Sequence, residues 1–160
     1  MSNKAIYPGT FDPITNGHIS IITRATLIFS KIILAITTNP SKNPMFSIEK
    51  RVECAKEAVA HLKNVEIIRF SGLLIHLAQE QKTNVLIRGL RNVEDFENET
   101  KRYHMNKYLN PTLEIIFLMA TEESTYLSSS LIKEIAQNGG NVESLLPASA
   151  FKALTNVYQT

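Results

Sequence analysis

Short apolar runs alternate along the chain with longer stretches in which apolar residues recur every three or four positions. The short runs are rich in Ile, Val and Leu and have few polar interruptions, which is typical of strands buried on both faces. They predict five strands, at residues 4–8, 31–38, 65–70, 84–89 and 113–120. The amphipathic stretches predict helices over residues 18–29, 47–62, 73–81, 92–109, 128–137 and 148–158.

This alternation of strand and helix indicates an α/β fold with a five-stranded parallel sheet and right-handed crossovers. We find no linker, low-complexity tract or internal repeat, so residues 1–160 are expected to form one doubly wound, Rossmann-like domain. In such sheets, ligands bind beyond the carboxyl ends of the strands, where the strand order reverses. The segments that follow each strand are therefore where functional residues are expected.

Composition narrows the class of protein. The chain has 160 residues, of which 44% are hydrophobic and 20% charged, which favours a packed core over disorder. A net charge of +2 without a basic run gives no reason to expect a nucleic-acid partner. The single cysteine, Cys54, and the lack of a signal peptide or a long apolar run predict a cytoplasmic protein with no membrane partner.

The loop after the first strand, GTFDPITNGH (residues 9–18), carries the most unusual composition. Gly9 and Gly17 allow close approach of the backbone to a ligand, and a helix that starts near His18 offers free N–H groups to a phosphate. The alternative is that Pro13 and Gly17 only form turns and that His18 only caps the helix. The glycines do not form a G-x-G-x-x-G fingerprint, so a phosphate site here is of another kind.

Basic residues follow two other strands. Lys42 lies after the second strand, in a loop in which a lysine is also common as ordinary surface. Arg88 and Arg91 flank Gly89 after the fourth strand, and two guanidinium groups at that edge of the sheet are suited to clamping a phosphate.

Acidic and hydroxyl residues complete the candidate set. Acidic side chains cluster at residues 94–99, where they either stabilise a helix start or orient Arg91 or bind a ribose. Ser128, Ser129 and Ser130 begin a helix after the fifth strand, which suits phosphate oxygens as well as ordinary capping. The scattered histidines have no partners at the spacing of metal ligands, so no protein metal site is expected.

Residues 15–18, Thr-Asn-Gly-His, match the T/H-x-G-H signature, and the chain is similar to the nucleotidyltransferase superfamily that carries it. The segments YPGTFDPITNGH, PSKNPMF, IRGLRNVEDFE and YLSSSLIKEIA, in matching order and spacing, resemble the phosphopantetheine adenylyltransferase family over essentially the whole chain. Many members of that family carry tyrosine where this chain has Asn98.

The resemblance implies transfer of the adenylyl group of ATP to 4′-phosphopantetheine, giving 3′-dephospho-coenzyme A and pyrophosphate. It implies catalytic roles for His18, Lys42 and Arg88, with His18 stabilising the transition state. It places Thr10, Lys42, Leu74 and Arg88 on phosphopantetheine. It places ATP on Thr10, Phe11, His18, Gly89, Leu90, Arg91, Glu99, Ser124, Thr125, Tyr126, Leu127, Ser128, Ser129 and Ser130. It also implies Mg²⁺ held mainly by ATP phosphates, a homohexamer, and feedback inhibition by coenzyme A.

Two alternatives stay open at the level of the sequence. A sibling enzyme that acts on nicotinamide mononucleotide or transfers a cytidylyl group would share the fold and His18, although such enzymes usually carry histidine at the position of Thr15. A non-catalytic nucleotide-binding protein would keep the cavity without turnover.

Overall fold

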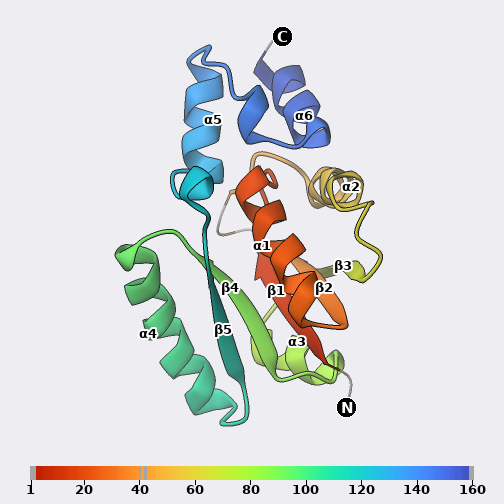
Figure 1. Cartoon of the computed structure of the whole chain (residues 1–160), viewed down its shortest axis with the longest axis vertical. Coiled ribbons are helices and arrows are strands. Elements are labelled where there is room, and N and C mark those ends of the chain that lie inside the picture. The colour runs from red at the N-terminus through yellow and green to blue at the C-terminus, as the bar shows by residue number, and fades with distance from the viewer. Residues whose placement is uncertain (1–2, 40, 42, 159–160) are drawn as a thin grey trace.

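The computed structural model describes residues 3–39, 41 and 43–158. One sheet holds five parallel strands in the order β3-β2-β1-β4-β5 (Figure 1). The strands are β1 (Lys4–Gly9), β2 (Lys31–Thr37), β3 (Val65–Phe70), β4 (Val85–Leu90) and β5 (Glu114–Met119). The predicted α/β fold with a five-stranded parallel sheet is therefore confirmed.

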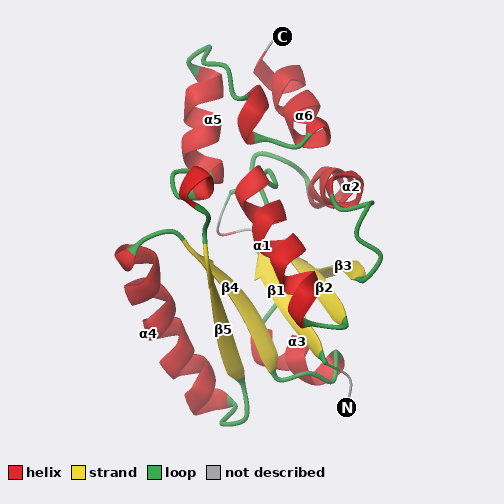
Figure 2. Ribbon diagram, in the orientation of Figure 1, coloured by secondary structure: helices red, strands yellow, loops and turns green. Residues whose placement is uncertain are grey.

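Six α-helices in the described part of the chain follow the strands and extend the fold beyond the sheet (Figure 2). They are α1 (Asn16–Ile28), α2 (Ile48–Ala58), α3 (Leu74–Glu80), α4 (Val93–Leu109), α5 (Ser129–Gln137) and α6 (Ala148–Tyr158). Two short 3₁₀ turns, η2 (Glu122–Ser124) and η3 (Glu143–Leu145), flank α5. Most bounds lie within two residues of the prediction. Helix α2 stops four residues early, because Ala60 and Leu62 donate their N–H groups to carbonyls three residues back and not four.

Alternate residues of the strands supply two hydrophobic cores, one on each face of the sheet. On β1, Ala5 and Tyr7 belong to the core beneath α1 and α2, whereas Ile6 belongs to the core beneath α3. This period of two is what a strand covered on both faces requires. Helices α5 and α6 lie beyond the carboxyl ends of the strands, at the opposite end of the molecule from the N-terminus (Figure 1).

The sequence NGG at residues 138–140 ends α5 as predicted. Gly139 adopts φ +79°, in the left-handed region that favours glycine, and the N–H of Gly140 bonds the carbonyl of Ile135 at 2.9 Å. The chain then turns back into α6, which packs against α2 and α5.

The strand order places β1 beside β4, so that the chain reverses direction across the sheet between these two strands. Their carboxyl ends diverge into separate loops at this point, which leaves a crevice in doubly wound sheets. Both the GTFDPITNGH loop and the segment that contains Arg88 and Arg91 begin at this crevice.

Candidate active site

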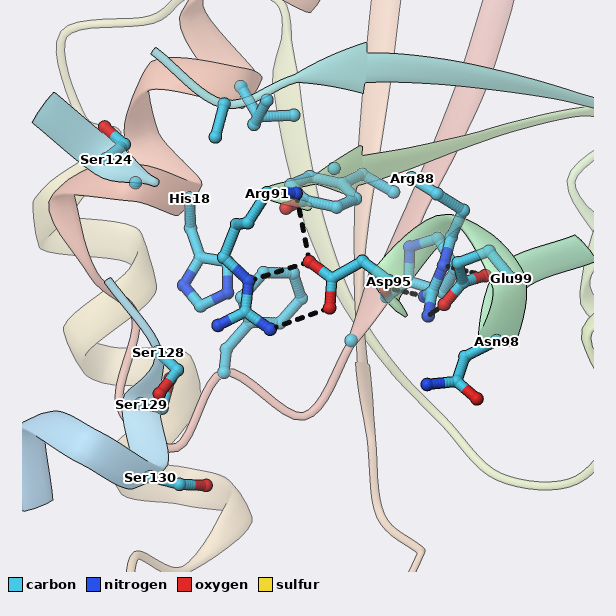
Figure 3. Close-up of a pocket in the computed structure, with 18 of the residues that line it drawn as sticks. His18, Arg88, Arg91, Asp95, Asn98, Glu99, Ser124, Ser128, Ser129 and Ser130 are labelled. Carbon is cyan, nitrogen blue, oxygen red and sulfur yellow. Dashed lines mark hydrogen bonds and ion pairs between the residues drawn. The ribbon is translucent and has the colours of Figure 1, made fainter. Parts of the chain in front are cut away.

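A cavity of about 400 Å³ opens at the carboxyl ends of β1 and β4 (Figure 3). Its size is within the usual range for a small-molecule site. Helices α1, α4 and α5 close its sides. Its lining residues are Tyr7, Pro8, Gly9, Phe11, Gly17, His18, Ile21, Arg88, Gly89, Arg91, Asp95, Asn98, Glu99, Arg102, Ala120, Ser124, Ser128, Ser129 and Ser130.

His18 is both a capping residue of α1 and a lining residue of the cavity. Thr15 is the N-cap of α1, and its side chain accepts the N–H of His18 at 3.3 Å. In return, the N–H of Thr15 donates to Nδ1 of His18 at 3.0 Å. Because Nδ1 acts as an acceptor, the neutral ring carries its proton on Nε2. The capping box thus fixes the tautomer of a histidine that lines the cavity.

The surroundings of His18 keep its ring neutral. Burial, followed by the positive charges of Arg91 and Arg88, lowers the pKa of His18 to about 4. The ring of Phe11 packs edge-on against the imidazole, with centroids 4.9 Å apart, and Phe11 itself adopts φ 48°. The start of α1 lies close to Ser124 and Leu127, since a Cβ added to Gly17 would be in ordinary van der Waals contact with their Cβ atoms at 3.5–3.6 Å.

Arg88 is held in place by Glu99 on α4. Its Nε and Nη2 donate to the two carboxylate oxygens at 2.9 and 2.5 Å, and Nη1 donates to the carbonyl of Pro8 at 2.8 Å. A guanidinium has five N–H donors, so two remain for a ligand. The carboxylate therefore orients the arginine and leaves one edge of the guanidinium available.

Arg91 is held in the same manner by Asp95, also on α4. Its Nε and Nη2 donate to Oδ2 and Oδ1 at 2.9 and 3.0 Å. In the view of Figure 3, the guanidinium lies between the ring of His18 and the carboxylate of Asp95. Orienting Arg91 is one of the roles that the sequence left open for the acidic run, and Asp95 fills it.

Helix α5 brings three serines to the far wall of the cavity (Figure 3). Ser128 is the N-cap and accepts the N–H of Leu131 at 3.1 Å, while Ser129 donates its hydroxyl to the carbonyl of Pro13 at 2.8 Å. Ser130 is exposed, and its hydroxyl makes no hydrogen bond within the described part of the chain. A helix start with free N–H groups and a hydroxyl is suited to phosphate oxygens.

A second cavity of about 280 Å³ adjoins the first and shares Pro8, Gly9, Arg88, Glu99 and Arg102 with it. One part is apolar, formed by Phe70, Leu74, Leu86 and Ile115. Polar side chains from Thr10, Thr37, Asn39 and Asn106 complete it. Thr10, Leu74 and Arg88, which the resemblance assigns to the acceptor, therefore meet in one cavity, and Arg88 lies at the boundary between the two.

Several predicted residues lie elsewhere. Thr10 lines the second cavity and not the first, and Leu90 is buried in β4. Thr125, Tyr126 and Leu127 line neither cavity, although they continue the segment of Ser124, which lines the first. Lys42 lies outside the described residues.

The lining residues that the sequence analysis did not single out include Tyr7, Arg102 and Asn106. Burial raises the pKa of Tyr7 to about 12, so its hydroxyl stays protonated beside the arginines. The sequence of α4 contains a pattern that could have indicated Arg102 and Asn106. Asp95, Glu99, Arg102 and Asn106 recur at spacings of three and four and form a polar face where a core-facing helix would be apolar.

Two buried charged residues fix the loops around both cavities. Asp12, 5% exposed, accepts the N–H groups of Met45 and Phe46 at 2.8 and 2.9 Å and the ammonium of Lys133 at 2.7 Å. Arg51, 3% exposed, donates to the carbonyls of Phe46, Thr10 and Thr37. These contacts connect the loop after β1 to α5 and to the loop after β2.

Other properties of the described residues bear on the class of site. No helix among them is long and apolar enough to cross a membrane. They contain no group of three or more His, Cys, Asp or Glu side chains placed to hold a metal ion.

Comparisons with known proteins address the family and the fold of the chain. A family model described as cytidylyltransferase-like matches residues 6–135. A solved structure of a Vibrio parahaemolyticus protein, described as a nicotinate-nucleotide adenylyltransferase, superposes with a TM-score of 0.72. The two chains are 16% identical, and the match covers 98% of this chain and 93% of the other. At that identity the superposition supports a common fold.

Proposed function

The chain belongs to the cytidylyltransferase-like family of nucleotidyltransferases, and from this premise we propose that it transfers the adenylyl group of ATP to 4′-phosphopantetheine. The products would be 3′-dephospho-coenzyme A and pyrophosphate. The observation that carries the proposal is the pair of adjoining cavities that meet at Arg88. A two-substrate transfer needs two binding sites whose reacting ends touch.

The first cavity is suited to ATP. It combines the neutral donor of His18, the oriented guanidinium of Arg91 and the N-terminus of α5. All three act on phosphate oxygens, and none requires a protein nucleophile.

The second cavity is suited to a phosphorylated pantetheine arm. Thr10 and Arg88 provide polar contacts for a phosphate at the end that adjoins the first cavity. Leu74 and Phe70 offer an apolar wall to the arm, and Asn39 and Asn106 offer amides that can pair with its amides. A nucleotide acceptor would leave this apolar part poorly filled.

In the proposed reaction, a phosphate oxygen of the acceptor attacks the α-phosphorus of ATP in line, and pyrophosphate leaves. The new P–O bond forms as the bond to pyrophosphate breaks, so the electrons balance without an enzyme-bound intermediate. Arg88 and, by the resemblance, Lys42 would hold the attacking phosphate. His18 would donate its Nε2 proton in a hydrogen bond to the α-phosphate as charge builds on its oxygens.

Magnesium fits the site as a companion of ATP. Asp95 and Glu99, the two carboxylates of the first cavity, are both engaged by arginines. We therefore propose that the phosphates of ATP and water hold Mg²⁺, which would neutralise charge on the leaving pyrophosphate.

We further propose that the protein forms a homohexamer inhibited by coenzyme A. Apolar side chains exposed on α4 and on the edge strand β5 support self-association. They include Val93 (73% exposed), Met105 (62%) and Tyr108 (83%) on α4, and Met119 (55%) on β5. Coenzyme A would compete at the same two cavities, because it contains both the pantetheine arm and an adenine nucleotide.

A panel of substrates tests the proposed function. Pyrophosphate release is measured with ATP or CTP and with 4′-phosphopantetheine, nicotinate mononucleotide or nicotinamide mononucleotide. We expect release from ATP with 4′-phosphopantetheine alone. Release with a mononucleotide instead would assign a sibling activity, and ATP binding without release for any acceptor would favour a non-catalytic protein.

A further inference from the structure

The charges that line the two cavities do not balance. Three guanidiniums, of Arg88, Arg91 and Arg102, meet two carboxylates, of Asp95 and Glu99. Arg91 and Asp95 pair with each other, and Arg88 and Glu99 do the same, each through two hydrogen bonds. Among the described lining residues, Arg102 therefore carries the excess positive charge, because Glu99, to which it is paired at 3.3 Å, is also the partner of Arg88.

Arg102 is placed at the boundary between the cavities and has donors to spare. It lines both cavities, and within the described part of the chain its side chain makes one hydrogen bond, from Nη1 to Oε1 of Glu99 at 3.3 Å. The same oxygen accepts Nη2 of Arg88 at the shorter distance of 2.5 Å. Four of the five N–H donors of Arg102 remain, on a side chain that is 57% exposed.

We propose that Arg102 binds the phosphate of the acceptor directly, as a second guanidinium opposite Arg88. The inference rests on the proposed function and adds a residue to it. In the ATP cavity, His18, Arg91 and the α5 serines already supply donors. In the described part of the second cavity, the charged side chains are Arg88, Glu99 and Arg102. A dianionic phosphate entering there meets a neutralised Arg88–Glu99 pair, so that Arg102 supplies the excess positive charge among the described lining residues.

The matched test compares ligands with and without the phosphate. Titration calorimetry measures binding of 4′-phosphopantetheine and of pantetheine to the wild type and to the variants Arg102→Ala, Arg102→Lys and Lys101→Ala. We expect Arg102→Ala to lower the affinity for 4′-phosphopantetheine by about tenfold or more and the affinity for pantetheine by less than twofold. Arg102→Lys should lower the affinity for 4′-phosphopantetheine less than Arg102→Ala does. Lys101 is exposed on α4 and lines neither cavity, so Lys101→Ala should bind both ligands normally.

A loss of less than twofold for 4′-phosphopantetheine, or an equal loss for both ligands, would overturn the inference. A second measurement separates direct binding from an effect through Glu99. Inorganic phosphate is titrated into protein labelled with ¹⁵N-arginine, and the Nε–H signals are followed by NMR. We expect the signals of Arg88 and Arg102 to shift together. A shift of the Arg88 signal without a shift of the Arg102 signal would contradict direct binding of phosphate by Arg102.

The two proposals can fail separately. If the wild type binds no 4′-phosphopantetheine, the proposed acceptor is wrong. The phosphate titration still decides the role of Arg102, because it uses the anion alone.

Discussion

His18 lines the first cavity as a neutral hydrogen-bond donor. Its Nδ1 accepts the N–H of Thr15, so the remaining proton lies on Nε2. Burial and the nearby arginines disfavour the imidazolium form. A neutral donor can follow the growing charge on a phosphate without a proton transfer, which suits a reaction between two phosphates.

The protonation state of His18 can be measured in the ligand-free protein. We expect its ring signals in NMR to keep their neutral-form shifts from pH 8 down to about pH 5, since its pKa is lowered to about 4. The unfolded chain protonates its histidines near pH 6.5, so it binds more protons than the native state between pH 6.5 and 4. The free energy of unfolding should therefore fall as the pH drops through that window, and fall less in His18→Ala. A His18 midpoint near pH 6.5 would contradict this account.

At the scale of elements, the strands and helices could be predicted from the sequence because hydrophobic periodicity reports burial directly. The carboxyl-end rule for parallel sheets also placed His18, Arg88 and Arg91 at one edge. The partners of the arginines could not be predicted, because the acidic run offers four carboxylates and only the path of α4 selects Asp95 and Glu99. The second cavity could not be predicted either, since its residues come from five strands, two helices and the loops between them.

Asp12 joins the loop after β1 to α5 through its ion pair with Lys133, and to the loop after β2 through the N–H groups of Met45 and Phe46. Asp12→Asn removes the negative charge and places an amide opposite N–H donors such as that of Met45. The partly buried ammonium of Lys133 then has no counter-ion. We expect a loss of about 3–5 kcal/mol in the free energy of unfolding, measured by urea denaturation. Lys50→Ala is the control, because its pair with Glu53 is exposed to solvent and should contribute little to the free energy of unfolding. Equal, small losses for both would show that the Asp12 contact is not a structural anchor.

At the scale of the whole molecule, the strand order decides where the two cavities lie. The reversal between β1 and β4 creates the crevice, and α4 and α5 close it on opposite sides. The outer surface of α4 carries Met105 and Tyr108, both well exposed. A helix that faces the cavities with polar residues and carries exposed apolar side chains on its outer surface is suited to lie between copies of the chain.

The proposed homohexamer predicts a mass of about six times the 18.0 kDa of one chain. Sedimentation velocity at micromolar concentration measures this directly. We expect Met105→Glu to shift the distribution toward smaller species, because it buries a charge in the proposed contact. A wild-type protein that sediments as a monomer would contradict the proposed homohexamer but not the proposed reaction.

The most direct test of the central claim is pyrophosphate release from ATP and Mg²⁺, measured with and without 4′-phosphopantetheine for the wild type and for His18→Ala. We predict that release in the wild type depends on 4′-phosphopantetheine. We also predict that His18→Ala lowers turnover by ~10²–10³, as expected for the loss of one transition-state donor, while ATP binding stays within a few fold. Turnover of His18→Ala within about threefold of the wild type, equivalent to ~0.65 kcal/mol, would contradict the assigned role of His18. Pyrophosphate release at the same rate with and without 4′-phosphopantetheine would contradict the assigned acceptor.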